Sequence, residues 1–210
     1  MNIPNLLTLS RFFLSGLMLV FLLSAWPYAK TAALIAFAAA SITDALDGYL
    51  ARRVYGSTAF GSLMDPLADK VMICCALVGF VQLHLIPVWI VVLILSREFL
   101  VTGLRVLVGT QGRIVPAGAW GKHKTAWQII LIVMVLARLS LYEDWSPLLF
   151  TGNGLLAGQV DIWFDTLTYL IAIGAALITM ASGVLYFHEH RNLITEHLNK
   201  PGVRAGGSTS

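Results

Sequence analysis

Long apolar runs, separated by short polar, glycine or proline breaks, make up most of the chain. Each run is close to the roughly 20 residues that an α-helix needs to cross a bilayer. The runs are continuous and lack the apolar–polar alternation of membrane β-strands. We therefore predict an all-α integral membrane protein, a bundle of six transmembrane helices at residues 6–27, 29–51, 62–84, 87–110, 122–142 and 162–187.

The two ends of the chain are more polar than its middle. Residues 2–13 mix apolar with polar side chains, which is typical of a short interfacial helix leading into the first span. The segment after residue 187 is polar, and its first half could form a cytoplasmic helix. We expect one membrane domain over residues 1–190 and a polar cytoplasmic tail over residues 191–210.

Composition supports a membrane protein. Hydrophobic residues make up 58% of the chain and charged residues 12%, whereas soluble domains average about 25% charged. One globular core cannot hide that much apolar surface, so an ordinary soluble enzyme and a disordered chain are both excluded. The formal net charge of +3 is too small to indicate a nucleic-acid partner.

The basic residues favour one orientation. With the N-terminus inside, only Lys30 and Arg138 fall outside, and residues 143–161 carry acids without Lys or Arg. By the positive-inside rule, both termini are expected in the cytoplasm. The basic residues on the inner side are Arg11, Arg52, Arg53, Arg97, Arg105, Arg113, Lys122, Lys124, Arg191, Lys200 and Arg204.

Four aspartates stand at the inner ends of the second and third spans. Asp44 and Asp47 are three residues apart, and Asp65 and Asp69 are four apart, so each pair shares one helix face. The short connection at residues 52–61 folds the two helices back on each other. The two carboxylate pairs are therefore expected to converge.

Clustered carboxylates at this depth need compensation by cations or protons. Each aspartate inside a bilayer costs about 2.5–3.5 kcal/mol on insertion scales, and Arg52 is the one basic residue that the pattern places on these faces. Divalent Mg²⁺, Mn²⁺ or Ca²⁺ prefers such oxygen ligands, and a two-ion site suits displacement at phosphorus. The alternatives are a metal or proton transporter, or carboxylates paired with interfacial bases.

The residues around the acids form a recognisable pattern. Asp44-x-x-Asp47-Gly48-x-x-Ala51-Arg52, eight residues, then Gly61-x-x-x-Asp65-x-x-x-Asp69 resembles the full CDP-alcohol phosphotransferase signature. The segment from Pro4 to Arg11 is similar to the N-terminal segment of that family. Residues 96–105 and 122–125 resemble the bacterial branch that makes phosphatidylglycerophosphate.

The resemblance implies a membrane phosphatidyltransferase. It would transfer the phosphatidyl group of CDP-diacylglycerol to sn-glycerol 3-phosphate and release CMP, in the inner (cytoplasmic) membrane of the cell, with its active site on the cytoplasmic side. It also implies two Mg²⁺ or Mn²⁺ ions, membrane-lipid contacts and a homodimer. Carried over residue by residue, Asp44, Asp47 and Asp65 bind metal, and Asp69 is the general base and also touches metal. The implied CDP-lipid-binding residues are Asn5, Thr8, Gly48, Ala51, Arg52, Thr58 and Gly61.

The acceptor has alternatives, because inositol phosphate, serine or phosphatidylglycerol could serve instead. A phosphate dianion needs fixed positive charge. Arg97 and Arg105 are eight residues apart, about 12 Å along one helix face. Lys122 and Lys124 begin the fifth span. All four could instead be positive-inside anchors. Small residues in the last span, Gly174, Ala175, Ala176 and Gly183, permit close helix contact.

Overall fold

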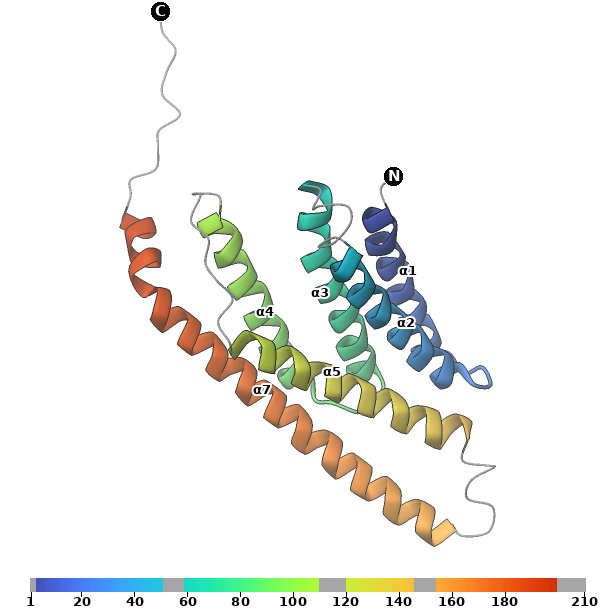
Figure 1. Cartoon of the computed structure of the whole chain (residues 1–210). Helices are drawn as coiled ribbons and strands as arrows, with labels where there is room; N and C mark the ends of the chain where they lie inside the picture. The colour runs from blue at the N-terminus through green and yellow to red at the C-terminus, as the bar shows by residue number, and fades with distance from the viewer. Residues whose placement is uncertain (1–2, 51–58, 110–119, 146–153, 200–210) are drawn as a thin grey trace, which may run out of the picture.

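A computed structural model describes residues 3–50, 59–109, 120–145 and 154–199 (Figure 1). Within these ranges the chain is helical, apart from turns at 24–28 and 83–87 and Trp145. The all-α prediction is therefore confirmed for the described chain. The elements are α1 (Ile3–Leu23), α2 (Ala29–Leu50), α3 (Ala59–Gln82), α4 (Val88–Gly109), α5 (Trp120–Leu139), the π-helical turn η2 (Ser140–Asp144) and α7 (Gly154–Asn199).

Each predicted apolar segment overlaps one helix. Two described stretches are long and apolar enough to cross a bilayer, Thr125–Asp144 and Ile162–Tyr186, with mean hydropathies of 1.7 and 1.9. Thr8–Leu23 is apolar but shorter. In α3 and α4, charged residues interrupt the apolar run. Six crossings therefore remain a prediction.

Helix α1 turns its polar face inward. Thr8, Arg11 and Ser15 are buried, with 2%, 1% and 0% of their surface exposed, whereas Leu9 and Phe13 are 57% and 72% exposed. The expected interfacial helix is not a separate element, because residues 3–23 form one unbroken helix. Polar residues of membrane helices face the bundle interior, and the buried polar side of α1 follows this pattern rather than that of a separate interfacial helix.

The helices form two groups that share one core. Helix α1 packs against α2 and α3, and α7 packs against α4 and α5, while α2 contacts both α5 and η2. The start of α1, the end of α2, the start of α3 and the ends of α4 and α7 lie toward the same end of the bundle (Figure 1). The acidic segments of α2 and α3 belong to this end.

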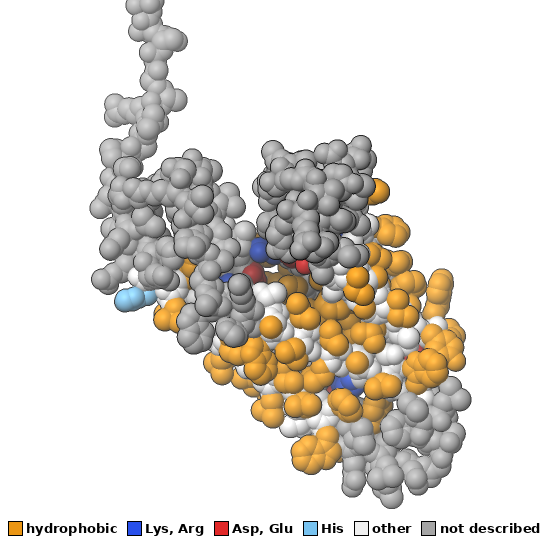
Figure 2. Space-filling view, in the orientation of Figure 1, with side chains coloured by type: hydrophobic (Ala, Val, Ile, Leu, Met, Phe, Trp, Pro, Cys, Tyr) orange, Lys and Arg blue, Asp and Glu red, His pale blue; other side chains and the backbone are white. Residues whose placement is uncertain are grey.

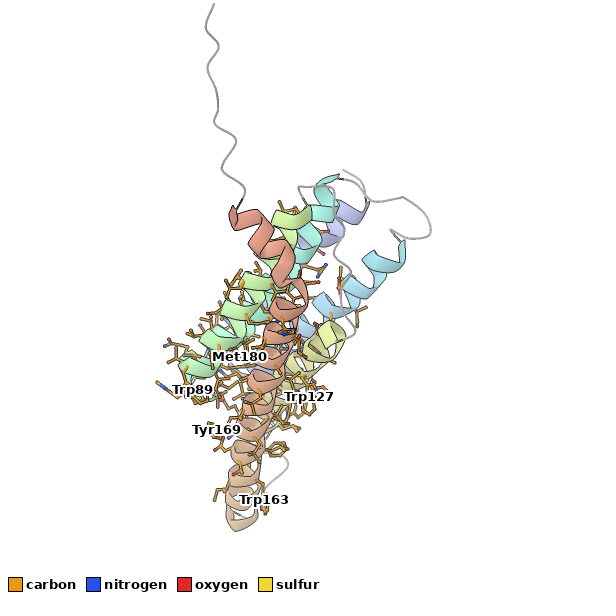
Figure 3. All side chains as sticks on the ribbon, turned by 90° about the vertical axis from the view of Figure 1, so that its left-hand side faces the viewer. Trp89, Trp127, Trp163, Tyr169 and Met180 are labelled. Carbon is orange, nitrogen blue, oxygen red and sulfur yellow. The ribbon has the colours of Figure 1, made fainter. Side chains whose placement is uncertain are left out.

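The outer surface is rich in large apolar side chains. Trp89 on α4, Trp127 on α5, and Trp163 and Tyr169 on α7 lie along the face shown in Figure 3, and all are 39–76% exposed. Such a continuous apolar surface would be costly in water. Together with the buried polar face of α1, it is typical of helices whose outer side contacts lipid.

At the opposite end of the bundle, η2 is tied to the first turn of α2. The backbone N–H and the hydroxyl of Thr31 both donate to Oδ2 of Asp144, each at 2.6 Å. Trp145 Nε1 also donates to the Thr31 hydroxyl at 3.1 Å. The first N–H groups of a helix have no partner within the helix, so Asp144 caps α2 from a distant part of the chain.

Lys30 closes the end of α1 nearby. Its ammonium donates to the carbonyl oxygens of Leu22 and Ser24 at 2.6 and 3.2 Å, and lies 3.5 Å from the carboxylate of Glu143. A cation at the end of a helix satisfies its last carbonyls and complements the helix dipole. Lys30 is therefore a buried cap with 6% exposure rather than a loop charge.

We predict that Asp144→Ala lowers the stability of the bundle by about 1–2 kcal/mol, as the loss of a helix cap does. Asp144→Asn should cost less, because the amide oxygen can still accept from Thr31. Thermal unfolding in detergent measures both effects. An Asp144→Ala protein as stable as the wild type would refute the capping role.

Candidate functional site

Arg11 joins the two acidic helices. Its Nη1 lies 3.0 Å from Oδ1 of Asp44 on α2, and its Nη2 contacts Oδ1 of Asp69 on α3. The arginine side chain is 1% exposed, whereas the two carboxylates are 49% and 47% exposed. A buried cation therefore lies behind two half-open carboxylates.

The packing of α1 fixes this contact. Arg11 lies one turn after Thr8 and one turn before Ser15 on the buried face. The Ser15 hydroxyl donates to the Arg11 carbonyl at 2.7 Å, a bond within the helix. Because α1 packs against both α2 and α3, the two terminal nitrogens of the Arg11 guanidinium reach one aspartate on each helix.

The basic residue that contacts the acidic cluster is not the one predicted from the sequence. We expected Arg52 to be the one basic residue on these faces, but Arg11 is the cation that the described residues place against Asp44 and Asp69. Arg52 itself lies outside the described residues. The sequence does contain a signal for the role of Arg11. This arginine lies in an apolar run, three residues after Thr8 and four residues before Ser15, so the three polar residues share one helix face.

The other two aspartates continue the same helices. Asp47 lies in α2 after Asp44, and Asp65 lies in α3 before Asp69. The helical register expected for each pair is thus present, but the side chains of Asp47 and Asp65 are not described. Among the described side chains, three or more potential metal ligands do not come together. Convergence of all four carboxylates therefore stays a prediction.

The residues expected to bind the CDP-lipid are described only in part. Thr8 is buried and lies one turn from Arg11 on the same face of α1. Asn5 lies in α1, Gly48 near the end of α2 and Gly61 near the start of α3, without described side-chain positions. Ala51, Arg52 and Thr58 fall outside the described residues.

Arg97 is the one expected acceptor residue whose side chain is described. It extends from α4, is 7% exposed, and donates from Nη2 to the Ser182 hydroxyl on α7 at 2.8 Å. Its Nη1 lies 3.4 Å from Oε1 of Glu98. Arg105 lies further along α4, and Lys122 and Lys124 lie in the first two turns of α5, so their side-chain grouping with Arg97 stays a prediction.

Glu98 links Arg97 to the rest of the bundle. Its Oε1 accepts from Gln128 Nε2 of α5 at 3.4 Å, and its Oε2 lies 4.0 Å from the ammonium of Lys70. Lys70 directly follows Asp69 on α3. A polar network therefore runs from α3 through α4 to α5, and a second branch reaches α7. Neither Lys70 nor Gln128 was predicted from the sequence to be a site residue.

The polar groups gather at one edge of an otherwise apolar surface. Figure 2 shows acidic and basic side chains close together above a broad area of hydrophobic side chains. The half-open carboxylates and nearby guanidinium groups make this edge suitable for binding a phosphorylated ligand with divalent cations.

The family model described as CDP-alcohol phosphatidyltransferase matches residues 1–188. The chain therefore belongs to the CDP-alcohol phosphatidyltransferase family, as the acidic pattern predicted. This is a family of membrane-associated biosynthetic enzymes that are generally metal-dependent.

The relatives identify a branch within this family. A Bacillus subtilis CDP-diacylglycerol–glycerol-3-phosphate 3-phosphatidyltransferase is 41% identical over 154 residues, covering 68% of this chain and 80% of the relative. The Pseudomonas fluorescens protein of the same name is 41% identical over 180 residues, covering 82% and 90%. A third, from Rickettsia bellii, is 32% identical over 187 residues, covering 89% and 93%.

We predict that Arg11→Met lowers the stability of the metal-free protein by about 1–3 kcal/mol, because two carboxylates lose their ion-pair partner. The loss is limited by water, which reaches both half-exposed acids. Arg11→Lys should lose less, since it keeps the charge without the two terminal nitrogens of the guanidinium. Thermal unfolding in detergent tests this order, and equal stability of Arg11→Met and wild type would contradict it.

Proposed function

We propose that this chain transfers the phosphatidyl group of CDP-diacylglycerol to sn-glycerol 3-phosphate, which yields phosphatidylglycerophosphate and CMP. The observation that carries the proposal is the contact of Asp44 and Asp69, from the two halves of the signature, with one buried arginine. The relatives named for this reaction, at 41% identity, support the choice of donor and acceptor.

In the proposed site, Asp44, Asp47, Asp65 and Asp69 hold two Mg²⁺ or Mn²⁺ ions. The donor set fits, because carboxylate oxygens are preferred by these hard cations. Asp44 and Asp69 also fit by exposure, since each is about half open although Arg11 contacts its Oδ1. When bound, the ions would neutralise the diphosphate and stabilise the departing CMP.

Asp69 is the proposed general base. The hydroxyl of glycerol 3-phosphate attacks the β-phosphorus of CDP-diacylglycerol and passes its proton to the Asp69 carboxylate. A new bond forms between phosphorus and the acceptor oxygen, and the bond from phosphorus to the bridging oxygen breaks. CMP leaves with that oxygen. Arg11 fixes the position of the Asp69 carboxylate from behind.

The nucleotide and the acceptor are proposed to bind on either side of the acids. Thr8, which is buried near Arg11, contributes to the CDP-lipid pocket from α1. Arg97 is proposed to bind the acceptor phosphate, because a guanidinium can donate two parallel hydrogen bonds to phosphate oxygens. The other proposed CDP-lipid residues are Asn5, Gly48, Ala51, Arg52, Thr58 and Gly61, and the other proposed acceptor residues are Arg105, Lys122 and Lys124.

The proposed setting is the inner membrane, with six spans and the active site at the cytoplasmic surface. The acidic end of the bundle also holds the start of α1 and the end of α7 (Figure 1), which agrees with two cytoplasmic termini. We propose one domain over residues 1–190, followed by a polar tail over residues 191–210, and a homodimer in contact with membrane lipids.

The function is tested by CMP release from purified protein in detergent with CDP-diacylglycerol. We expect release only when glycerol 3-phosphate and Mg²⁺ or Mn²⁺ are both present. Release with inositol phosphate, serine or phosphatidylglycerol instead would keep the chemistry and replace the acceptor. No release with any acceptor, together with ion flux in liposomes, would favour a transporter.

Asp69→Asn should reduce turnover about 10²–10⁴-fold, the usual contribution of a general base. Binding of CDP-diacylglycerol should be largely preserved, because the amide has a similar shape and the other acids remain. Steady-state CMP release and equilibrium binding of the donor measure the two effects. The control is Glu143→Gln, which also removes a half-exposed carboxylate but at the opposite end of the bundle. This variant should stay fully active. Near-normal turnover of Asp69→Asn would refute the base assignment.

A further inference from the structure

The side chain of Arg97 lies directly on Gly183 of α7. A Cβ atom at position 183 would be 3.0 Å from Arg97 Cγ, 3.6 Å from Nε and 3.9 Å from Cδ. A distance of 3.0 Å is too short for a comfortable carbon–carbon contact, since the optimum is about 3.5–4.0 Å. The absence of a side chain at Gly183 therefore gives the arginine stem its path along α7.

The preceding residue holds the other end of the same side chain. Ser182 is 6% exposed, and its hydroxyl accepts from Arg97 Nη2 at 2.8 Å. The stem and the head of Arg97 are thus set by two consecutive residues of α7. On the α4 side, Glu98 lies 3.4 Å from Nη1 and is itself held by Gln128.

This contact changes the interpretation of the small residues in α7. Gly183 was grouped with Gly174, Ala175 and Ala176 as a surface for close helix contact. Ala175 and Ala176 are 1% and 4% exposed within the core, and Gly183 is covered by Arg97. Of the two glycines in this group, Gly174 is the one at which an added Cβ would meet nothing within 4 Å.

We propose that Ser182 and Gly183 are positioning residues that aim the Arg97 guanidinium at the phosphate of the acceptor. The inference rests on the proposed function, in which Arg97 binds glycerol 3-phosphate. A guanidinium binds phosphate best through two parallel hydrogen bonds, so its orientation matters as much as its charge. A side chain held in place before binding also loses less conformational freedom when the acceptor arrives.

Gly183→Ala and Gly174→Ala form a matched pair on one helix. We expect Gly183→Ala to raise the KM for glycerol 3-phosphate about tenfold, because a displaced guanidinium loses one of its two phosphate hydrogen bonds. The KM for CDP-diacylglycerol and the thermal unfolding midpoint should change little. Gly174→Ala should match the wild type in all these quantities.

Ser182 provides a second test that does not depend on added bulk. Ser182→Ala should raise the KM for glycerol 3-phosphate about threefold, since it removes one hydrogen bond to the arginine. Ser182→Thr keeps the hydroxyl and should restore most of the wild-type value. This pair decides the proposal if Gly183→Ala does not fold.

The outcomes separate the two proposals. The wild-type protein could release CMP with glycerol 3-phosphate while Gly183→Ala and Ser182→Ala leave the KM for glycerol 3-phosphate unchanged. That result would overturn the positioning role alone. Equal increases in the KM for donor and acceptor would also overturn it, because they indicate a general disturbance of the bundle. Wild-type protein without any glycerol 3-phosphate-dependent release would overturn the proposed function, and this inference with it.

Discussion

A buried guanidinium holds the acidic end of this bundle together. Two aspartates on neighbouring helices repel each other, and their approach in a membrane protein needs a compensating cation. Arg11 supplies that charge from a third helix, with its side chain almost fully buried and the two carboxylates half open. The relative positions of α1, α2 and α3 therefore depend on the same contact that positions Asp44 and Asp69, two of the proposed metal ligands.

Polar groups lie in the interior at both ends of the bundle, whereas its middle has an apolar interior and an apolar outer face. At the acidic end, Arg11 and the network around Glu98 lie in the interior. At the opposite end, Lys30 and Asp144 satisfy the ends of α1 and α2. Between these ends the interior is apolar, and large apolar side chains cover the outer face (Figure 3). The charges thus fix the helix ends, while packing fixes the middle.

The helices and the acidic motif could be predicted from sequence because both depend on local spacing. Apolar runs of suitable length located every described helix, and the spacing of Asp44 from Asp47 and of Asp65 from Asp69 set the register. The partners of the charges could not be predicted in the same way. A polar face on residues 2–13 fits water or a bundle interior equally well, and only the packing of α1 against α2 and α3 distinguishes them. Likewise, the positive-inside count assigns Lys30 and Arg97 to a side of the membrane by charge alone, and it does not show that both are buried. The role of Gly183 depends on α4, which is distant in sequence.

The acids of α2 and α3 are proposed to form one cation-binding site beside Arg11. Binding of Mn²⁺ to purified, metal-free protein, followed by electron paramagnetic resonance in detergent, tests it most directly. We predict that Asp44→Asn weakens Mn²⁺ binding about tenfold or more, equivalent to ~1.4 kcal/mol, while Glu143→Gln at the far end leaves it unchanged. Equal Mn²⁺ affinity in wild type and Asp44→Asn would contradict a cation-binding site that includes Asp44.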